Sequence, residues 1–548
     1  MTKQANTMTK QANTMTKQAN KISYDEVPYS PFTFSYTSPP YLRTIGKLFG
    51  LNPPPLETAK ILELGCGIGV NLLNFAETYP KSQSLGVDLS KTQIELGKKI
   101  ISDLKIKNAE LKALSILDLD ESYGKFDYIV CHGVYSWVPE EVQDKILKVC
   151  NKLLNPNGIA FVSYNTLPGW NMQRTIREMI MFHSELFNTS HDKLQQAKLL
   201  LKFINDSLES STTPYSNFLR DETKLLSAYT DSYVLHEYLG EINTGIYFHQ
   251  FIEKAQKNHL NYLGDTSLTA MFIGNLPTQA AEKLQAVNDI VRTEQYMDFI
   301  TNRKFRSTLL CHQNIPINRK IEFNNLKEFF TSLNIRPVIL EKAVDLTNEQ
   351  ENVSFYYENL PEPFISTTSP IMKAILYVYA ENISNPISLE QVAKEAFKKL
   401  GKYQLQDFLA ALEQHFIIFI FQGYLKIFET KPHAIATITE KPKTSEFARY
   451  QAKQAYFNNV TSVFSVTNRL NDMVGIPIHE KYILEMLDGT HNIDDIKKGV
   501  LEKINSKLLT ARDDKGQEVT DPKLLKEFVD YVVNTSLEKF RINYLLVE

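Results

Sequence analysis

The sequence predicts an α/β protein with a parallel sheet, helices on both faces of that sheet, and a mainly helical C-terminal half. From residue 60 to residue 165, short apolar runs alternate with amphipathic runs of helical spacing. A turn with three glycines at alternate positions, GCGIG at 65–69, joins the first apolar run to the first amphipathic run. Strands that alternate with helices form parallel sheets, and such sheets bind ligands at the carboxyl ends of their strands. We therefore expect a ligand site beside the glycine turn.

Five strands and the helices between them account for the alternating region. The first helix, 69–79, follows the glycine turn and spaces Leu72, Leu73 and Ala76 for burial on one face. The strands are expected at 60–65, 84–90, 109–116, 126–134 and 159–165, and the remaining helices at 91–106 and 140–154.

The alternation stops after residue 170, where a helical insertion begins. It resumes with a helix that leads into a short strand at 260–263, and a further strand is expected at 305–311. We expect these to be the last two strands of the same sheet.

The segment 345–438 has the pattern of a winged helix, with three helices followed by a hairpin over 417–429. Its third helix carries Asp407 and Glu413, whereas a DNA-reading helix needs Arg or Lys there, so a packing or dimerisation module is favoured. The chain is expected to divide into a disordered repeat tail (1–20), a sheet domain (21–170), a helical middle domain that returns the last two strands (171–344), this winged-helix-like module (345–438) and a C-terminal helical module (439–548).

The composition argues against nucleic-acid-binding, zinc-binding and membrane-spanning proteins. The 548 residues carry 60 basic and 63 acidic side chains, a net charge of −3 that argues against a nucleic-acid binder. Four cysteines lack the spacing of zinc ligands, so we expect reduced thiols, no metal site and a cytoplasmic location. The apolar run FIIFIF at 416–421 is too short for a membrane span. The repeated MTKQANT at the N-terminus lacks the apolar core of a signal peptide.

Glu63 and the glycine turn predict the ligand. The spacing G-x-G-x-G at Gly65, Gly67 and Gly69 differs from the G-x-G-x-x-G of a nicotinamide site. An acid just before the turn would repel a pyrophosphate at the helix N-terminus. A cationic ligand with an α-amino group suits Glu63, and S-adenosylmethionine (AdoMet) is such a ligand. The alternative is a tight strand–helix turn without a ligand.

Two further acids follow the next strands. Asp88 ends the second strand, where a carboxylate can accept both hydroxyls of a ribose; the alternative is that it caps the following helix. Asp118 follows the third strand, where it can accept the adenine amino group or be a simple loop residue, and Leu117 can pack on the adenine. The full cofactor-binding set expected is Glu63, Gly65, Cys66, Gly67, Asn71, Asp88, Leu89, Leu117, Asp118, His132, Gly133 and Tyr24.

These motifs together resemble a known family. LELGCGIG, GVDLS, LDLD, FDYIVCHGVYSWV and LNPNGIAFVSYNT are similar to class I AdoMet-dependent methyltransferases, which have a Rossmann-like core. The lead-in YDEVPYSPFTFSYTSPPYLRTIGKLFGL with HGVYSWVP, VSYNTLPGW, HEYL, YFHQF and FRSTLLCH resembles the rickettsial type of bacterial protein-lysine methyltransferase, over residues 21–548. The resemblance implies AdoMet as cofactor, S-adenosylhomocysteine (AdoHcy) as product, and lysines of outer membrane protein B as acceptors.

Aromatic residues after the fourth and fifth strands are the candidates for the acceptor side. An acceptor lysine must lose a proton before it attacks, and burial among aromatic rings favours the neutral amine. Such rings also attract methylated ammonium groups. The residues expected to take part in catalysis are Tyr135, Trp137 and Tyr164, with His132 as a proton acceptor. Structural packing is the alternative for each of them, and also for Tyr24, Tyr29 and Tyr36, which we consider as a lid over the cofactor.

We expect an AdoMet-dependent N-methyltransferase that acts by in-line transfer to a desolvated, neutral lysine amine of a surface protein. A small-molecule methyltransferase of the quinone or lipid type shares every cofactor motif, but the large C-terminal half argues against it. An adenine or RNA methyltransferase needs an N/D-P-P-Y/W type of motif after the fourth strand, where this chain has HGVYSWV. A non-catalytic AdoMet-binding protein is a third alternative. A homodimer is compatible with the sequence.

Overall fold

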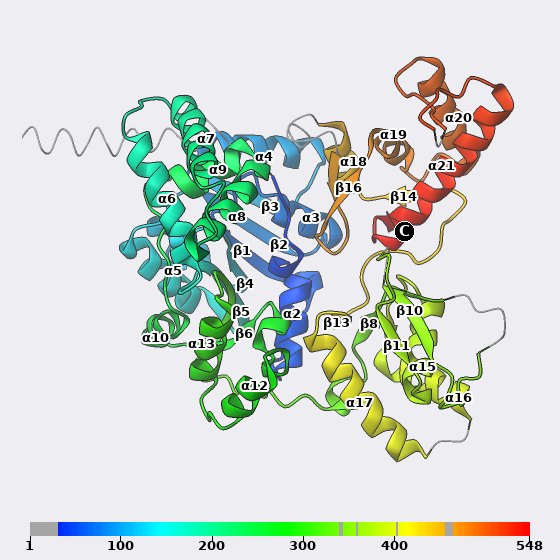
Figure 1. Ribbon diagram of the computed structural model, residues 1–548, viewed down its shortest axis with the longest axis horizontal. Helices are drawn as coiled ribbons and strands as arrows, with labels where there is room; N and C mark the ends of the chain where they lie inside the picture. The colour runs from blue at the N-terminus through cyan, green and yellow to red at the C-terminus, as the bar shows by residue number, and fades with distance from the viewer. Residues whose placement is uncertain (1–30, 339–343, 358–359, 402–403, 455–463, 514) are drawn as a thin grey trace, which may run out of the picture.

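The computed structural model describes residues 31–338, 344–357, 360–401, 404–454, 464–513 and 515–548 (Figure 1). The N-terminal repeat and the lid candidates Tyr24 and Tyr29 lie outside the described residues. Within these ranges, no helix is long and apolar enough to cross a membrane.

A seven-stranded sheet forms the centre of the α/β part, with strand order β3-β2-β1-β4-β5-β7-β6. The first five strands pair in parallel, while β7 pairs antiparallel with both β5 and β6. The prediction of an α/β fold is confirmed, and the two late strands lie in this sheet. The strands are β1 (Lys60–Leu64), β2 (Gln83–Asp88), β3 (Ala109–Ala113), β4 (Phe126–Cys131), β5 (Leu154–Asn165), β6 (Leu260–Asp265) and β7 (Phe305–His312).

The sheet is buried on both faces because successive side chains of each strand point in opposite directions. On β1, Ile61 packs with the face covered by α2, α3 and α4, whereas Leu62 and Leu64 pack with the face covered by α5 and α10. The helices of these two layers are α2 (Pro39–Leu48), α3 (Val70–Thr78), α4 (Lys91–Asp103), α5 (Glu140–Lys152), α10 (Phe248–Lys257) and α13 (Ile290–Thr301).

A buried ion cluster ties α13 to the late strands. Arg306 of β7 has no solvent exposure and pairs with Glu294 at 2.9 Å and Asp298 at 2.8 Å, both on α13. Its guanidinium also lies 3.6 Å from the ring centroid of Phe248. This cluster fixes the edge of the sheet that carries the insertion.

The insertion between β5 and β6 is a helical unit with its own small core. In Figure 1 its helices lie over the carboxyl ends of the parallel strands, so the insertion closes one side of the expected ligand site. Its helices are α6 (Trp170–Ser184), α7 (Ser190–Ser207), α8 (Pro214–Ala228) and α9 (Asp231–Leu239), and α11 (Leu268–Met271) and α12 (Thr278–Gln285) follow β6.

The described residues in the middle of the C-terminal half form four helices, one of them a single turn, and short strands. The predicted hairpin over 417–429 is wrong in its first arm, because the run Ile417–Phe421 continues α17 (Leu405–Phe421). Phe416, Phe419 and Ile420 are buried against neighbouring helices, and this packing outweighs the strand preference of the run. The other elements are α14 (Phe323–Leu326), β8 (Phe330–Ser332), β9 (Ile335–Pro337), β10 (Val353–Tyr357), β11 (Ile365–Thr367), α15 (Pro370–Glu381), β12 (Ile387–Ser388), α16 (Leu389–Leu400) and β13 (Lys426–Phe428).

The last part of the chain packs against α3 of the sheet domain (Figure 1). Phe447 and Tyr450 of α18 share a buried cluster with Val70 and Leu73 of α3. The core of this last part joins a two-stranded hairpin to four helices among the described residues. The elements are β14 (Lys443–Thr444), α18 (Glu446–Lys453), β15 (Phe464–Thr467), β16 (Met473–Ile476), α19 (Ile478–Met486), α20 (Ile493–Asn505), α21 (Pro522–Ile542) and β17 (Leu546–Val547).

Candidate active site

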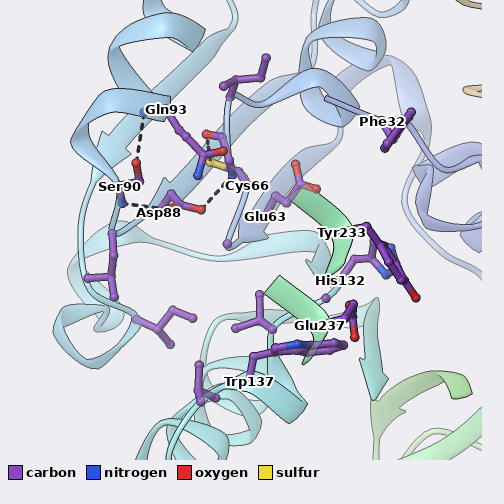
Figure 2. Close-up of a pocket in the computed structure, with 18 of the residues that line it drawn as sticks. Phe32, Glu63, Cys66, Asp88, Ser90, Gln93, His132, Trp137, Tyr233 and Glu237 are labelled. Atoms are coloured by element: carbon purple, nitrogen blue, oxygen red, sulfur yellow. Dashed lines mark hydrogen bonds between the residues drawn. The ribbon is translucent and has the colours of Figure 1, made fainter. Parts of the chain in front are cut away.

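A cavity of about 1860 Å³ opens at the carboxyl ends of β1, β2 and β4. It extends from the glycine turn to the inner side of the helical insertion (Figure 2). Eleven of the predicted site residues line it: Glu63, Gly65, Cys66, Gly67, Asn71, Asp88, Leu89, Asp118, His132, Gly133 and Trp137.

The glycine turn needs bare backbone. Gly65 has φ +71°, and a Cβ added there would come within 2.3 Å of a methyl carbon of Val134. Gly67 has φ +55°, and its backbone N–H points to Asp88. Positive φ is easily adopted by glycine alone, so the turn presents its backbone directly to the cavity.

Glu63 is a buried carboxylate at the base of this turn. It is 4% exposed, and its Oε1 accepts a hydrogen bond of 3.0 Å from Nδ2 of Asn71. Its Oε2 has no hydrogen-bond partner among the described residues. Burial raises the pKa of Glu63 to about 7, the Asn71 hydrogen bond opposes the rise, and the nearby charge of Asp88 adds to it. A buried carboxylate with a free oxygen is suited to a cationic ligand group.

Asp88 organises the neighbouring corner of the cavity. Its Oδ2 accepts from the backbone N–H of Gly67 and its Oδ1 from that of Ser90, each at 2.9 Å. Each carboxylate oxygen has a second lone pair, so Asp88 can also accept from the hydroxyls of a ligand. Ser90, rather than Asp88, caps α4 by accepting from the N–H of Gln93.

An apolar side chain extends the Asp88 corner towards Asp118. Leu89 is 67% exposed although it is apolar, and it lines the cavity with Asp118. Leu117 is 39% exposed and is not part of the described lining, where its neighbour Ile116 takes part. A flat apolar group of a ligand bound in this corner can therefore contact Leu89 and Ile116 next to the Asp118 carboxylate.

These residues fit AdoMet. The free oxygen of Glu63 matches its ammonium group, the glycine turn leaves room for its amino-acid part, and Asp88 and the apolar corner match its ribose and adenine. Within the described parts of the chain, no group of three or more His, Cys, Asp or Glu side chains is arranged to hold a metal ion.

His132 is neutral. Burial lowers its pKa to about 4. Its Nδ1 lies 2.9 Å from the hydroxyl of Ser163, and its ring meets the ring of Phe34 edge-on at 4.4 Å. The hydroxyl of Tyr36 lies 3.4 Å from Nε2. An imidazole with this pKa is a weak proton acceptor at neutral pH, and its ring contacts with Phe34 and Tyr36 favour a role as an aromatic wall.

The far wall of the cavity is aromatic and acidic. Trp137 follows β4, and Tyr233 and Glu237 come from α9 of the insertion. Figure 2 shows Trp137, Tyr233 and Glu237 among the side chains that line the cavity. Glu222 and Glu241 of the insertion also line the cavity, and Lys304, directly before β7, belongs to the same lining. This wall is suited to a cationic group with an apolar stem.

Comparison with known proteins identifies the family. The model described as "Methyltransferase domain" matches residues 56–210, "Predicted methyltransferase regulatory domain" matches 230–312, and "PKMT, C-terminal winged helix domain" matches 440–545. The solved structure of PKMT2 from Rickettsia typhi in complex with AdoHcy is 87% identical, with a TM-score of 0.90, and the match covers 95% of this chain and 100% of that one. The structure of the same protein described without AdoHcy is 85% identical, with a TM-score of 0.88 and the same coverage. The protein RP789 of Rickettsia prowazekii (strain Madrid E) is 45% identical over 524 residues, 96% of this chain and 93% of the relative.

The chain belongs to the PKMT family, the protein-lysine methyltransferases.

PKMT membership confirms the resemblance read from the sequence, the class I methyltransferase fold and dependence on AdoMet. The family's winged helix model covers 440–545, whereas the sequence predicts a winged-helix pattern at 345–438. The strands β15 and β16 have only four residues each, too few to predict a wing from sequence alone.

Two of the four predicted catalytic residues lie away from the cavity of this PKMT. Tyr164 is fully buried, stacks on Phe251 of α10 with a centroid distance of 4.1 Å, and hydrogen-bonds Thr308 at 2.9 Å. Tyr135 is 1% exposed and meets Phe251 edge-on. Strand alternation turns Tyr164 towards α10, while its neighbour Asn165 lines the cavity. Neither tyrosine belongs to the described lining.

Sequence reasoning missed the residues that other elements bring to the PKMT site. Phe32 and Phe34 reach it from the lead-in segment, and Tyr233 and Glu237 reach it from α9. The motif HEYL contains Glu237 and was informative for the family, but nothing in its spacing pointed to the cavity.

Proposed function

We propose that this chain methylates lysine side chains of a bacterial surface protein of the outer membrane protein B type. The observation that carries the proposal is the aromatic and acidic wall of Trp137, Tyr233 and Glu237, continuous with the cofactor end of the same cavity. A lysine ammonium is a cation on an apolar stem, which such a wall attracts. A quinone-type acceptor reacts as a phenolate, which Glu222, Glu237 and Glu241 would repel.

At the cofactor end, Glu63 would hold the AdoMet ammonium, Asp88 the ribose hydroxyls, and Asp118 with the Leu89 side chain the adenine. When bound, AdoMet supplies an electrophilic methyl group on its sulfonium. The chain's own contribution is to fix the direction of approach and to keep water out, which accounts for a large share of the rate in displacement reactions. The cited R. typhi protein was solved with AdoHcy, which supports this assignment.

At the acceptor end, the protein must turn an ammonium into an amine. A lysine has a pKa near 10.4 in water. The ring faces of Trp137 and Tyr233 would hold the side chain, and the Glu237 carboxylate is the group suited to receive its proton. The pKa of the Tyr233 phenol is raised by burial and by Glu237, so this tyrosine stays neutral and acts as a ring face. His132, with a pKa of about 4, is not needed as a base.

We propose that methylation takes place in the cytoplasm, on the unfolded substrate before export. All four cysteines are free and buried, as expected for a protein from a reducing compartment. An unfolded acceptor can bring many different lysines to one site. The resemblance to the rickettsial enzymes supports outer membrane protein B as this acceptor.

We also propose a homodimer. Four large apolar side chains of the insertion are exposed: Phe182 at 80%, Leu186 at 77%, Leu199 at 56% and Phe203 at 67%. Exposed apolar groups on one unit are typical of a protein interface. Sedimentation should give a dimer for the natural chain and a monomer for a Phe182→Asp, Phe203→Asp variant. Equal mass for both would contradict this interface.

The acceptor site is tested by Glu237→Gln, with unfolded outer membrane protein B fragments as substrate. Loss of the carboxylate should lower kcat/KM for the fragment about tenfold, because a charge-assisted contact is lost. AdoMet affinity should not change. Glu209→Gln, an exposed acid of the same insertion, is the matched control. Wild-type kinetics in the Glu237 variant would contradict the proposal.

A further inference from the structure

The C-terminal part of the chain reaches the cofactor end of the cavity through one turn. Residues 468–472 connect β15 to β16, and Figure 1 shows this hairpin beside α3, the helix that follows the glycine turn. At the end of the turn, Asn471 is 3% exposed and has φ +66°. Asparagine is among the few residues that adopt this conformation readily.

The Asn471 side chain connects directly to the buried carboxylate. Its Nδ2 donates to Oδ1 of Asn71 at 3.0 Å, and Nδ2 of Asn71 donates to Oε1 of Glu63 at 3.0 Å. The two asparagines are 400 positions apart in the sequence. Two hydrogen bonds therefore separate the C-terminal part from Glu63.

Backbone groups fix the direction of both amides. Oδ1 of Asn71 also accepts from the backbone N–H of Phe34 at 3.1 Å, so this end of the amide must be the oxygen. Nδ2 of Asn471 also faces the backbone carbonyl of Phe34 at 3.3 Å, so that end must be the nitrogen. The Nδ2 group of Asn71 must therefore be the end of the amide that faces Glu63.

A second set of contacts anchors the turn on α3. Nδ2 of Asn74 donates to Oδ1 of Asn471 at 2.8 Å and to the carbonyl of Asn468 at 3.1 Å. Arg469 pairs with Glu77 at 3.2 Å. The turn is held independently of Asn71, so it can act as a rigid support for that side chain.

We infer that Asn471 is a positioning residue of the AdoMet site, which orients Glu63 through Asn71. The C-terminal part is then a component of the cofactor site as well as a domain packed beside it. The inference rests on the proposed assignment of the AdoMet ammonium to Glu63. Asn471 also holds Phe34, which lines the cavity and packs on His132.

Loss of Asn471 has a consequence that depends on pH. The Asn71 hydrogen bond opposes the rise in the pKa of Glu63 that burial causes. The titratable groups that interact with Glu63 are Asp88 at the end of β2, Cys66 of the glycine turn and Cys131 of β4, and Asp88 adds to the rise. Without Asn471, Asn71 keeps only the Phe34 N–H on its oxygen among the described residues, and its hydrogen bond to Glu63 should weaken. The pKa of Glu63 should then rise further, and the charged form needed for AdoMet should appear only at higher pH.

The test is Asn471→Gly in the full chain, because glycine keeps positive φ without strain. Lys507→Gly is the matched control, since Lys507 also has positive φ (60°) in the C-terminal part and is exposed. Calorimetry with AdoMet at pH values on both sides of 7 should show about tenfold weaker binding for Asn471→Gly, with the pH midpoint of binding moved upward. The control should bind like the natural chain. Natural affinity and an unchanged midpoint in Asn471→Gly would overturn the inference.

A double-mutant cycle separates positioning from general destabilisation. Asn71→Ala alone should weaken AdoMet binding, and adding Asn471→Gly to it should weaken binding little further, because the pathway is already broken. An undiminished second loss would overturn the role of Asn471 through Asn71. If Glu63→Gln binds AdoMet like the natural chain, the assignment of the ammonium to Glu63 fails instead, and methyl transfer to lysine is then judged by the acceptor assays alone.

Discussion

Replacing Glu63 by Gln should stabilise the cofactor-free protein at high pH relative to the natural chain, while it weakens AdoMet binding. The pKa of Glu63 is raised from 4.5 to about 7, mainly by burial. Between these two values the folded protein binds more protons than the unfolded chain, so its stability falls as the pH rises. Above about pH 7 Glu63 is ionised in both the folded and the unfolded state, so the loss of folding stability has reached its full size.

The size of this loss of stability follows from the difference between the two pKa values of Glu63. One pKa unit corresponds to about 1.4 kcal/mol, so the ionised carboxylate costs the folded state about 3 kcal/mol above pH 7. Glutamine has no such cost and keeps an oxygen for Asn71, but it leaves a buried N–H₂ unpaired, which costs about 1–3 kcal/mol at every pH. The difference in stability between variant and natural chain should therefore move in favour of the variant by about 2–3 kcal/mol from about pH 5 to about pH 8.

Thermal unfolding of both proteins without cofactor measures this difference. The gap in Tm should shift by about 5 °C in favour of Glu63→Gln over the same pH range, if the sheet domain unfolds as a unit of about 200 residues. AdoMet affinity of the variant should fall about tenfold or more, because a contact between charges is lost. A Tm gap that is independent of pH, or one that moves in favour of the natural chain as the pH rises, would contradict a raised pKa of Glu63 in the folded protein.

Four further substitutions test other parts of the site and fold. Asp88→Ala should lower AdoMet affinity about a hundredfold, because it removes the expected ribose acceptor and the acceptor of two backbone N–H groups; retained micromolar affinity in calorimetry would contradict the assignment. Trp137→Ala should reduce turnover about tenfold with AdoMet affinity unchanged, whereas Tyr135→Phe should leave turnover and AdoMet affinity alone because the Tyr135 hydroxyl is buried and has no partner among the described residues; equal losses of turnover in both would show that Tyr135 belongs to the site. Arg306→Met should destabilise the protein by about 3–5 kcal/mol in denaturant unfolding, because two buried carboxylates on α13 lose their guanidinium partner at hydrogen-bond distance; a change below 1 kcal/mol would contradict the importance of this ion cluster.

The sequence was most informative where a site residue lies next to the strand that carries it. Glu63, the glycines and Asp88 sit at the carboxyl ends of β1 and β2, and alternation of strands and helices alone brings those ends together. Tyr164 was also expected at the site because it lies at the end of a strand. Its side chain points to α10, and that of the next residue, Asn165, lines the cavity, because successive side chains of a strand point to opposite faces of the sheet.

Other parts of the site depend on contacts that no local pattern records. Glu237 reaches the cavity only because the insertion folds back over the sheet, and Asn471 reaches Asn71 only because the C-terminal part packs on α3. The run at 417–421 shows the converse: its strand-like residues are helical because neighbouring helices bury them. Packing between segments far apart in the sequence therefore determines which of these residues reach the site and whether the run at 417–421 is a helix or a strand; sequence periodicity does not.

The proposed reaction is the transfer of methyl groups from AdoMet to lysines of an unfolded outer membrane protein B fragment. The most direct measurement incubates the purified chain with labelled AdoMet and two fragments, one natural and one with every lysine replaced by arginine, and reads the products by mass spectrometry. We expect mass increases of whole methyl groups on lysine residues of the natural fragment and none on the lysine-free fragment. Equal labelling of both fragments, or AdoMet binding without any labelling, would contradict the claim and favour a small-molecule acceptor or a non-catalytic AdoMet-binding role.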